Sequence, residues 1–505
     1  MAQGALQYDV CIVGGGVNGT GIARDLAARG ARVLLCEKGD LASATSSSST
    51  KLIHGGLRYL EYYDFKLVRS ALKERRLLMR LAPHIIWPLR FILPHYKALR
   101  PRWLIRAGLF IYDHLARRDK LLPASKSVSL RKGKYGAPLI KKFKKGFSYS
   151  DCWVDDARLV TLNAVSAAHM GAEIANYTSC TRVQRKGGRW LITLKDNQDG
   201  SEFCITASMI VNATGPWVKQ FQDVMGLTQD DTQPVRLVKG SHIIVKKMYE
   251  GDHNYILQQP DGRIIFTIPY EDDFTLIGTT EEHLEGSIDE AHISANEIDY
   301  LCASINATFE KKIGPDDILF TYSGVRPLAE DGESDDKAVS RDYELIWSYE
   351  DQAPMLSVYG GKITTYRKLS EKVGTLIRKK MPQFELGEGQ THKSPLPGGD
   401  FSYKDRDGFV SELVERYPFL YEKLAHRYMR SYGTLCQIFL EGKNALDELG
   451  THFGAGLYAA EIDYLMTHEF AVTPEDVLMR RTKLGLKLTG KEKANVVQYV
   501  RAFQF

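Results

Sequence analysis

The sequence predicts an α/β fold that combines a Rossmann-like domain of the two-dinucleotide type, a domain built on an antiparallel sheet, and a helical C-terminal domain. Three observations indicate this arrangement. A glycine-rich turn joins an apolar run to a helical stretch near the N-terminus, apolar and polar residues alternate over much of 172–280, and strand-like patterns nearly vanish beyond residue 404. A chain of 505 residues is also too long for one ordinary core, so several domains are expected.

The glycine turn has the sequence context of a dinucleotide-binding site. An apolar strand at Val10–Val13 precedes it, a helix follows and stops at Gly30, and a second strand at 32–36 ends in Glu37. In such a unit, N–H groups at the helix N-terminus bind the pyrophosphate, and the acidic residue accepts hydrogen bonds from ribose hydroxyls. The predicted cofactor contacts are Gly14, Gly15, Gly16, Asn18, Gly19 and Glu37.

Two later features favour FAD over NAD. A hairpin-rich insertion ends in Asn212-Ala213-Thr214-Gly215, typical of the strand that returns beside the first strand in two-dinucleotide flavoproteins. The run Thr45–Thr50 directly follows the second strand, and its hydroxyls suit cofactor phosphate and flavin edges, although a flexible serine loop is the alternative. No residue suggests a flavin attachment point, so non-covalent FAD is expected. The further predicted contacts are Thr45, Ser46, Ser47, Ser49, Lys51, Ala213 and Gly215.

The rest of the chain divides by its periodicity. Gly187-Gly188 separates the strands of a hairpin, Asp261-Gly262 is a turn within the antiparallel sheet, and Leu396–Gly399 is a plausible linker. We expect strands at 235–245, 255–259, 264–268, 343–349 and 355–359. We assign 1–395 to an FAD-dependent region, with cofactor-binding segments at about 8–80, 150–225 and 350–390 and substrate segments at about 81–149 and 226–349, and 396–505 to the helical domain.

Charge is unevenly distributed along the chain. The net charge is +5, but residues 97–145 hold 15 Lys and Arg against only Asp113 and Asp119. Such asymmetry indicates an anionic partner, and a membrane surface and nucleic acid both fit. The aromatic residues in this segment show no stacking-module pattern, so we expect no nucleic acid.

Cysteine usage and the N-terminus indicate the compartment. The seven cysteines include no CxxC pair, which fits a reducing compartment and gives no reason to expect a metal site. The N-terminal residues lack a secretory pattern, and no run of 18 apolar residues is present. We therefore expect a cytoplasmic protein that lies on the membrane without crossing it.

Several long motifs resemble FAD-dependent glycerol-3-phosphate dehydrogenases, and the resemblance covers nearly the whole chain. The motifs are Ala44–Glu61 (ATSSSSTKLIHGGLRYLE), Tyr149–Leu159 (YSDCWVDDARL), Asn212–Trp217 (NATGPW), Lys239–His242 (KGSH), Tyr322–Leu328 (YSGVRPL) and Gly360–Arg367 (GGKITTYR). The resemblance implies oxidation of sn-glycerol 3-phosphate to dihydroxyacetone phosphate, with electrons passing through FAD to a membrane quinone. Because the chain lacks the transit peptide and calcium-binding extension of mitochondrial relatives, it resembles the aerobic, bacterial type. A peripheral position on the inner face of the cytoplasmic membrane follows from the same resemblance.

A phosphate dianion in the substrate calls for arginines that converge on it, since the planar guanidinium binds phosphate bidentately. Arg326 lies in a Ser-Gly-x-Arg-Pro turn and is matched by the resemblance. Arg341 precedes a strand, and Arg58 and Tyr59 follow two glycines. For a single arginine, the alternative is a surface ion pair.

Oxidation of an alcohol by flavin requires hydride transfer to N5 and removal of the hydroxyl proton, which a histidine can accept. His242, within an expected strand, is the preferred base and His54 is the second choice; a buried structural histidine is the alternative for either one. Gly361, Lys362 and Thr364 open a helix, where Lys362 would stabilise negative charge at the flavin N1/C2=O position. The alternative is ordinary helix capping by Thr364.

Other functions stay open at this point. The scaffold also suits a glycerol-3-phosphate oxidase that uses O₂, an amine or amino-acid oxidase, or a non-catalytic flavoprotein sensor. The acidic loop 330–336 does not match the spacing of a twelve-residue calcium loop, so a solvated turn is expected there. The oligomeric state, a homodimer included, is not fixed by the sequence.

Overall fold

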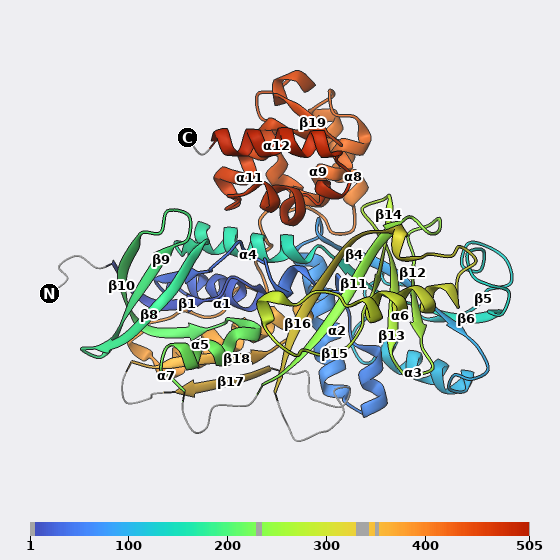
Figure 1. The fold of residues 1–505 in the computed structure, drawn as a ribbon, viewed down its shortest axis with the longest axis horizontal. Coiled ribbons are helices and arrows are strands. Elements are labelled where there is room, and N and C mark those ends of the chain that lie inside the picture. The colour runs from blue at the N-terminus through green and yellow to red at the C-terminus, as the bar shows by residue number, and fades with distance from the viewer. Residues whose placement is uncertain (1–5, 229–234, 330–342, 349–352, 504–505) are drawn as a thin grey trace.

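The computed structural model describes residues 6–228, 235–329, 343–348 and 353–503. Two sheets lie side by side, and the helical C-terminal domain packs above them (Figure 1). The predicted fold class is confirmed: a dinucleotide-binding sheet, a largely antiparallel sheet and a helical C-terminal domain are all present. No helix among the described residues is long and apolar enough to cross a membrane.

The first sheet has eight strands in the described residues, with β17-β18-β10-β1-β2-β7 as its main path. Five neighbouring strands from β18 to β7 run parallel, and the β8–β9 hairpin extends from β10. Its strands are β1 (Leu6–Val13), β2 (Val33–Cys36), β7 (Glu173–Ala175), β8 (Thr178–Lys186), β9 (Arg189–Asp196), β10 (Glu202–Asn212), β17 (Tyr343–Ser348) and β18 (Met355–Gly360).

Helices cover one face of this sheet and the β8–β9 hairpin and α5 pack toward the other. Val10 and Ile12 of β1 face the helices, whereas Cys11 and Val13 face the hairpin and Trp190. This alternation along β1 follows from the two-residue period of a strand. The helices are α1 (Val17–Ala28), α4 (Asp156–His169), α5 (Val218–Val224) and α7 (Tyr366–Lys380).

The second sheet carries the wall of the central cavity. It has ten strands in the described residues, with β15-β11-β14-β13-β12-β4-β6-β3 as its main path, while β16 pairs with β11 and β5 with β6. Helices α2 and α3 pack on one face and α6 on the other. Its strands are β3 (Leu52–Ile53), β4 (Ile86–His95), β5 (Lys126–Ser129), β6 (Lys145–Val154), β11 (Val235–Lys246), β12 (Asn254–Gln258), β13 (Ile264–Tyr270), β14 (Phe274–Gly278), β15 (Glu282–His283) and β16 (Ile318–Ala329); its helices are α2 (Phe65–Leu81), α3 (Arg102–His114) and α6 (Ala295–Asn306).

Two strands lie in a different sheet from the one that their assigned segments imply. β17 falls in the segment 226–349 but pairs antiparallel with β18 in the first sheet. β3 falls in the segment 8–80 but pairs with β6 in the second sheet. Both strands lie at sheet edges. The partner of β3 lies far along the chain, whereas β17 forms a hairpin with the next strand, β18; in neither case does the periodicity of the strand indicate which sheet it joins.

The C-terminal domain has its own hydrophobic core, which runs from Phe409 to Val500. The segment that precedes it is packed rather than free, because Leu396 is buried and its N–H donates to the Leu81 carbonyl at 2.8 Å. Its elements are α8 (Arg406–Arg416), α9 (Glu422–Tyr432), α10 (Cys436–Leu440), β19 (His452–Gly454), β20 (Leu457–Tyr458), α11 (Ala459–His468), a π-helical segment η10 (Asp476–Arg481) and α12 (Gly490–Phe503).

A buried ion pair joins the C-terminal domain to α4. The Arg158 guanidinium donates to both carboxylate oxygens of Glu469, and both side chains are fully buried. Arg158 also donates from Nε to the Ser431 carbonyl at 2.9 Å. The Arg158 side chain, on α4, thus has both of its hydrogen-bond partners, Glu469 and Ser431, in the C-terminal domain.

Replacing Arg158 by methionine should lower the free energy of unfolding by about 3–5 kcal/mol, because the Glu469 carboxylate would stay buried without its counter-ion. Urea denaturation followed by circular dichroism measures the loss. Arg430→Met is the matched control, since its partner Asp272 is 58% exposed and such pairs contribute about 0–1 kcal/mol. Equal losses in the two variants would contradict this account of the interface.

Candidate active site

The glycine turn is closed so tightly that side chains do not fit. A Cβ on Gly19 would lie 1.9 Å from the Gly14 carbonyl oxygen, and Gly14 itself has a φ of +114°. A Cβ on Gly14 would lie 2.5 Å from the Ala213 carbonyl oxygen. The turn therefore places the N-terminus of α1 against the end of β10, and a nucleotide can approach the backbone closely there.

Glu37 closes the same turn from β2. Its two carboxylate oxygens accept from the N–H groups of Gly15 at 2.6 Å and Gly39 at 3.0 Å. Burial raises the pKa of Glu37, and these two N–H groups act in the opposite direction. Because each carboxylate oxygen has a second lone pair, Glu37 can still accept from ribose hydroxyls.

The donor set fits FAD. Asn18 reaches across to the third segment, where its Nδ2 donates to the Gly360 carbonyl at 3.1 Å, and its Oδ1 is buried without a partner among the described residues. Gly361, with φ +98°, lies against this amide. Ser46 accepts from the Val17 N–H at 2.9 Å, which ties the serine loop to the first turn of α1.

A cavity of about 980 Å³ begins at the serine loop and extends between the two sheets. It brings together residues from four chain segments that the sequence analysis selected. They are His54, Arg58, Tyr59, His242, Arg326 and Lys362, together with Thr45, Ser46, Ser49, Gly361 and Thr364 from the predicted cofactor contacts. Gly14, Gly15, Gly16, Asn18, Gly19, Glu37, Ala213 and Gly215 form the adjoining nucleotide turn rather than this cavity's wall.

His242 stands on β11 at the cavity wall. Its Nε2 lies 3.0 Å from Oγ1 of Thr50, and its ring stacks on Tyr322 with centroids 4.8 Å apart. The space for the ring comes from Gly278 on β14, where a Cβ would lie 2.2 Å from Cδ2 of His242. Burial lowers the pKa of His242 well below its usual value, and Lys51 and Arg326 act in the same direction. The imidazole is therefore neutral at physiological pH.

His54 has a different hydrogen-bond arrangement. Its Nδ1 accepts from the Gly56 N–H at 3.1 Å, so the neutral ring carries its proton on Nε2. A ring in that tautomer offers a donor to a substrate rather than an acceptor. The two histidines thus differ in the ring nitrogen that is engaged, which is Nε2 in His242 and Nδ1 in His54.

Arg326 enters the cavity from β16. It lies beside Gly240, where a Cβ would lie 2.9 Å from Nη2, and Gly240 pairs with Gly324 across the strands. These two glycines leave an open floor between His242 and Arg326. The guanidinium also donates to the Glu281 carboxylate at 3.3 Å, and 30% of the arginine side chain is exposed.

Lys362 and Tyr59 meet at another part of the wall. The Lys362 ammonium lies 3.9 Å from the centroid of the Tyr59 ring. Thr364 does not cap the following helix with its side chain; its Oγ1 accepts from the His54 N–H at 3.3 Å. A helix begins at these residues, as the sequence predicted: the short 3₁₀ turn η6 (Ile363–Thr365) follows Lys362 and continues directly into α7.

Some of the predicted residues lie elsewhere. The Lys51 ammonium bonds the Asp156 carboxylate at 2.8 and 3.0 Å and the Ser47 carbonyl at 2.9 Å, and neither Lys51 nor Ser47 lines the cavity. Lys51 thus holds the loop from behind. Arg341 and the acidic loop 330–336 lie outside the described residues.

Sequence reasoning missed four residues that shape this site. Thr50 and Tyr322 lie inside the quoted motifs, so the motifs themselves were the available signal, but Thr50 was considered only with the hydroxyls of the serine loop and Tyr322 was assigned no role. Gly278 and Glu281 had no local signal, because their importance comes only from pairing with β11 and contact with Arg326.

Known proteins match the chain over nearly its full length. A family model described as FAD dependent oxidoreductase matches residues 9–367, and one described as the C-terminal domain of alpha-glycerophosphate oxidase matches residues 389–502. Glycerol-3-phosphate dehydrogenase from Pseudomonas aeruginosa is 49% identical, with 98% of this chain and 95% of that protein covered. Aerobic glycerol-3-phosphate dehydrogenase from Escherichia coli is 46% identical, with 97% of each covered. The chain belongs to the FAD-dependent glycerol-3-phosphate dehydrogenases.

A solved structure and a further relative are also similar to this dehydrogenase. The solved structure of glycerol-3-phosphate dehydrogenase from Bacillus halodurans complexed with FAD has a TM-score of 0.74 at 25% identity, with 98% of this chain and 94% of that chain covered. D-erythritol 1-phosphate dehydrogenase from Brucella abortus is 46% identical, with 97% of each covered. FAD is the cofactor of this dehydrogenase, as the sequence predicted.

His242 should make the fold of the dehydrogenase sensitive to acid. Its pKa is lowered in the folded state, whereas the unfolded residue titrates near about 6.5, so below that pH the unfolded state binds a proton that the folded state does not. The free energy of unfolding should therefore fall as the pH falls from about 6.5 to 5, and His242→Gln should show a shallower fall. Urea denaturation at each pH measures both slopes. Identical slopes would mean that His242 is not held neutral. His84 is also buried, but it is present in both proteins and so does not contribute to the difference between their slopes.

Proposed function

We propose that the dehydrogenase oxidises sn-glycerol 3-phosphate to dihydroxyacetone phosphate and passes the electrons to a quinone in the membrane. The observation that carries this proposal is the pairing of a cation, Arg326, with a neutral imidazole, His242, across a floor of two glycines in one cavity. The oxidation of a phosphopolyol needs these two groups: a cation that binds the phosphate and a base that accepts the proton of the hydroxyl. FAD, when bound, supplies the acceptor for the hydride that leaves C2.

The phosphate end of the substrate is assigned to Arg326, together with Arg58, which lines the same cavity. Without substrate, the Arg326 charge is partly balanced by Glu281 at 3.3 Å. A dianion that displaces this carboxylate gains a bidentate, charge-assisted contact. Arg341, which is matched only by a short motif, is kept as a proposed third cation.

The proton is assigned to His242. The neutral ring can accept it, and Thr50 lies within hydrogen-bond distance of Nε2 to orient the imidazole. His54, whose ring donates from Nε2, suits a hydrogen bond to the substrate hydroxyl or to the cofactor edge. Lys362, at the turn that Asn18 binds, is assigned to the negative charge that develops when the cofactor is reduced.

A four-carbon phosphopolyol is the second candidate substrate. The chain is as similar to D-erythritol 1-phosphate dehydrogenase from Brucella abortus as to the aerobic enzyme of Escherichia coli, at 46% identity each. Both substrates share the phosphate and the secondary alcohol, so the same arginine and histidine would serve. Three glycerol-3-phosphate dehydrogenases with 46–49% identity, against one erythritol phosphate enzyme, favour the smaller substrate.

The electron acceptor is assigned to the bilayer because of α3. Leu104 and Ile111 line the cavity and are also 40% exposed, so they lie at its mouth. Trp103 and Phe110 on the same helix are 71% and 55% exposed, and Arg102 and Arg106 accompany them. Exposed apolar side chains among cations favour contact with an anionic lipid surface. An oxidase that reduces O₂ would not need this surface.

The proposed lipid contact covers less of the basic segment 97–145 than its sequence suggested. Leu109 and Tyr112 of α3 are buried in the core beneath the helix, and Phe143, among four lysines, is buried in the core near α6. The helical period explains the division, since residues three or four apart share one face. The four lysines remain cationic groups near the surface, but Phe143 offers no apolar side chain to lipid.

Anaerobic addition of glycerol 3-phosphate should bleach the flavin absorbance, and Arg326→Met should raise the half-saturating concentration. The loss of one charge-assisted contact should lower kcat/KM by about 1.5–3 kcal/mol, or roughly 10- to 100-fold. Arg263→Met is the control, because Arg263 is another cation that lines the same cavity and the proposal assigns it no contact with the phosphate. Faster bleaching by D-erythritol 1-phosphate would move the assignment to the larger substrate, and bleaching by amino acids alone would refute it.

His242→Asn should slow flavin reduction by substrate about 10²- to 10⁴-fold in stopped-flow measurements, while FAD content stays the same. The reason is that asparagine can fill much of the space but cannot accept the proton. Thr50→Val is the companion variant and should cause a smaller loss, since it removes only the group that orients the ring. An unchanged rate in His242→Asn would reassign the base.

Exposed α3 residues should control membrane binding. In flotation with anionic liposomes at low salt, the wild-type protein should rise, and a Trp103→Ser/Phe110→Ser double variant should rise less, because two exposed apolar groups are lost. Ile438→Ser, 48% exposed on the C-terminal domain, is the matched control and should float normally. Activity with a soluble dye should be unaffected in both. Wild-type protein that stays at the bottom would point to a soluble acceptor.

A further inference from the structure

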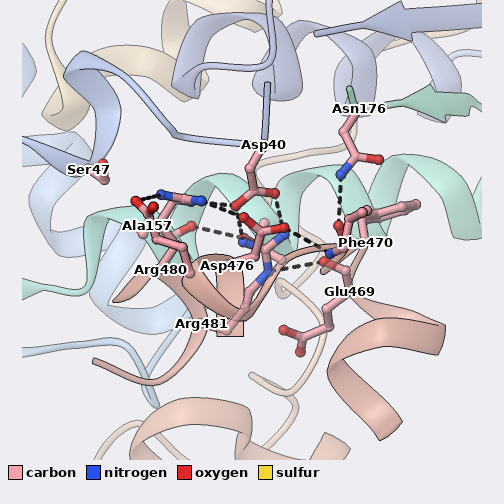
Figure 2. Close-up of polar contacts among 12 residues, drawn as sticks. Asp40, Ser47, Ala157, Asn176, Glu469, Phe470, Asp476, Arg480 and Arg481 are labelled. Carbon is pink, nitrogen blue, oxygen red and sulfur yellow. Dashed lines mark hydrogen bonds and ion pairs between the residues drawn. The ribbon is translucent and has the colours of Figure 1, made fainter. Parts of the chain in front are cut away.

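A basic segment of the C-terminal domain, Arg480–Lys483, reaches into the cofactor-binding domain. Figure 2 shows Arg480 and Arg481 converging on Asp40, which comes from the loop after β2. Arg480 Nε lies 2.5 Å from Asp40 Oδ2, and the two Nη atoms of Arg481 each lie 2.8 Å from one Asp40 oxygen. Asp40 and Arg481 are both 1% exposed. One buried carboxylate is thus held by two guanidinium groups, of which that of Arg481 is also buried and that of Arg480 is slightly exposed.

Asp40 belongs to the loop that carries Glu37. In this loop the Gly39 N–H donates to the Glu37 carboxylate. The Ala42 N–H, two residues after Asp40, donates to the Gly15 carbonyl at 3.2 Å. The loop is therefore fastened to the glycine turn on one side and to the basic segment on the other. A shift of Asp40 would be passed on to Glu37 within three residues.

The basic segment has a second anchor at the start of α4. The Lys483 ammonium bonds the Asp155 carboxylate, and Asp155 caps α4 by accepting from the Arg158 N–H. The next residue, Asp156, accepts from the Lys51 ammonium and from the Ser49 hydroxyl at 2.7 Å. One dipeptide thus joins the C-terminal domain to the serine loop.

The C-terminal domain holds the basic segment in shape before it meets these partners. Asp476 begins the π-helical segment and accepts from the Thr473 N–H at 2.8 Å, while it also bonds Arg480. Arg481 Nε donates to the Glu469 carbonyl at 3.0 Å. Burying charged groups costs desolvation that an apolar contact would avoid, so such an arrangement is better explained by the position it fixes than by the stability it adds.

We propose that the basic segment is a positioning element of the flavin site, which sets the Glu37 loop through Asp40 and the serine loop through Asp155 and Asp156. This inference rests on the FAD contacts proposed above for Glu37 and the serine loop. The residues of the segment do not touch the cavity; they act through the two loops. The C-terminal domain therefore contributes to cofactor affinity without contributing a ligand.

The test is FAD binding to apoprotein, measured by quenching of flavin fluorescence, with the visible circular dichroism of the bound flavin as a second signal. Arg481→Met should raise the Kd for FAD about tenfold and alter the dichroism, while the KM for glycerol 3-phosphate at saturating FAD stays within about twofold. Arg481→Lys, which keeps the charge but not the bidentate contact, should give an intermediate Kd. If Arg481→Met does not fold, Arg480→Met and Asp40→Asn carry the same measurement.

Two controls separate positioning from general stability. Arg427→Met breaks a buried pair with Glu461 inside the C-terminal domain and should lower the Tm without changing the Kd for FAD. Lys487→Met breaks a contact with Asp273 of the second sheet and should leave both unchanged. A Kd for Arg481→Met no higher than that for Arg427→Met would overturn the proposal.

Glu37→Gln distinguishes this failure from a failure of the proposed FAD contacts. If Glu37→Gln weakens FAD binding and Arg481→Met does not, only the role of the basic segment is refuted. If Glu37→Gln leaves the Kd unchanged, the cofactor contact assigned to Glu37 is itself wrong, and the inference built on it falls too.

Discussion

The close approach of two backbones at the glycine turn governs the rest of the site. With 1.9 Å between a hypothetical Gly19 Cβ and the Gly14 carbonyl oxygen, and 2.5 Å between a Gly14 Cβ and the Ala213 carbonyl oxygen, even a methyl group would separate α1 from β10. That contact sets where Asn18 meets Gly360 and where Ser46 meets Val17. These two hydrogen bonds join the segment at Gly360 and the serine loop to the start of α1, and so they position two parts of the cavity wall.

Buried charge links the loop behind the cavity to the chemistry within it. Lys51 pairs with Asp156, and its ammonium also lies 5.0 Å from the centroid of the Tyr322 ring, whose partner in stacking is His242. A lysine that is not exposed to the cavity thus helps to lower the pKa of the imidazole that is. The groups that hold the loop and the group that would accept a proton belong to one electrostatic unit.

Local pattern predicted the parts of the molecule that depend on local pattern. The strand–glycine–helix unit, the hairpin at Gly187-Gly188 and the helical C-terminal domain follow from residue spacing, and the structure has them. Partners far apart in sequence were not predictable in this way: Lys51 finds its carboxylate 105 residues later, and Glu281 approaches Arg326 only through the pairing of β11 with its neighbours. The two faces of α3 lie between these cases, because a three- to four-residue period separates buried Leu109 and Tyr112 from exposed Trp103 and Phe110.

The strand order also has a consequence for synthesis on the ribosome. β10 lies between β1 and β18, so the first strand made, at residues 6–13, has no parallel partner on that side until residue 212 has emerged, and that partner lacks its own until residue 360. The parallel strands of this sheet are therefore all present only when translation is well past its midpoint. Asp40 waits longer still, because Arg480 and Arg481 leave the ribosome among the last residues. A nascent chain stopped before residue 480 would lack both cations that hold Asp40, so the loop after β2 would not yet be attached to the C-terminal domain.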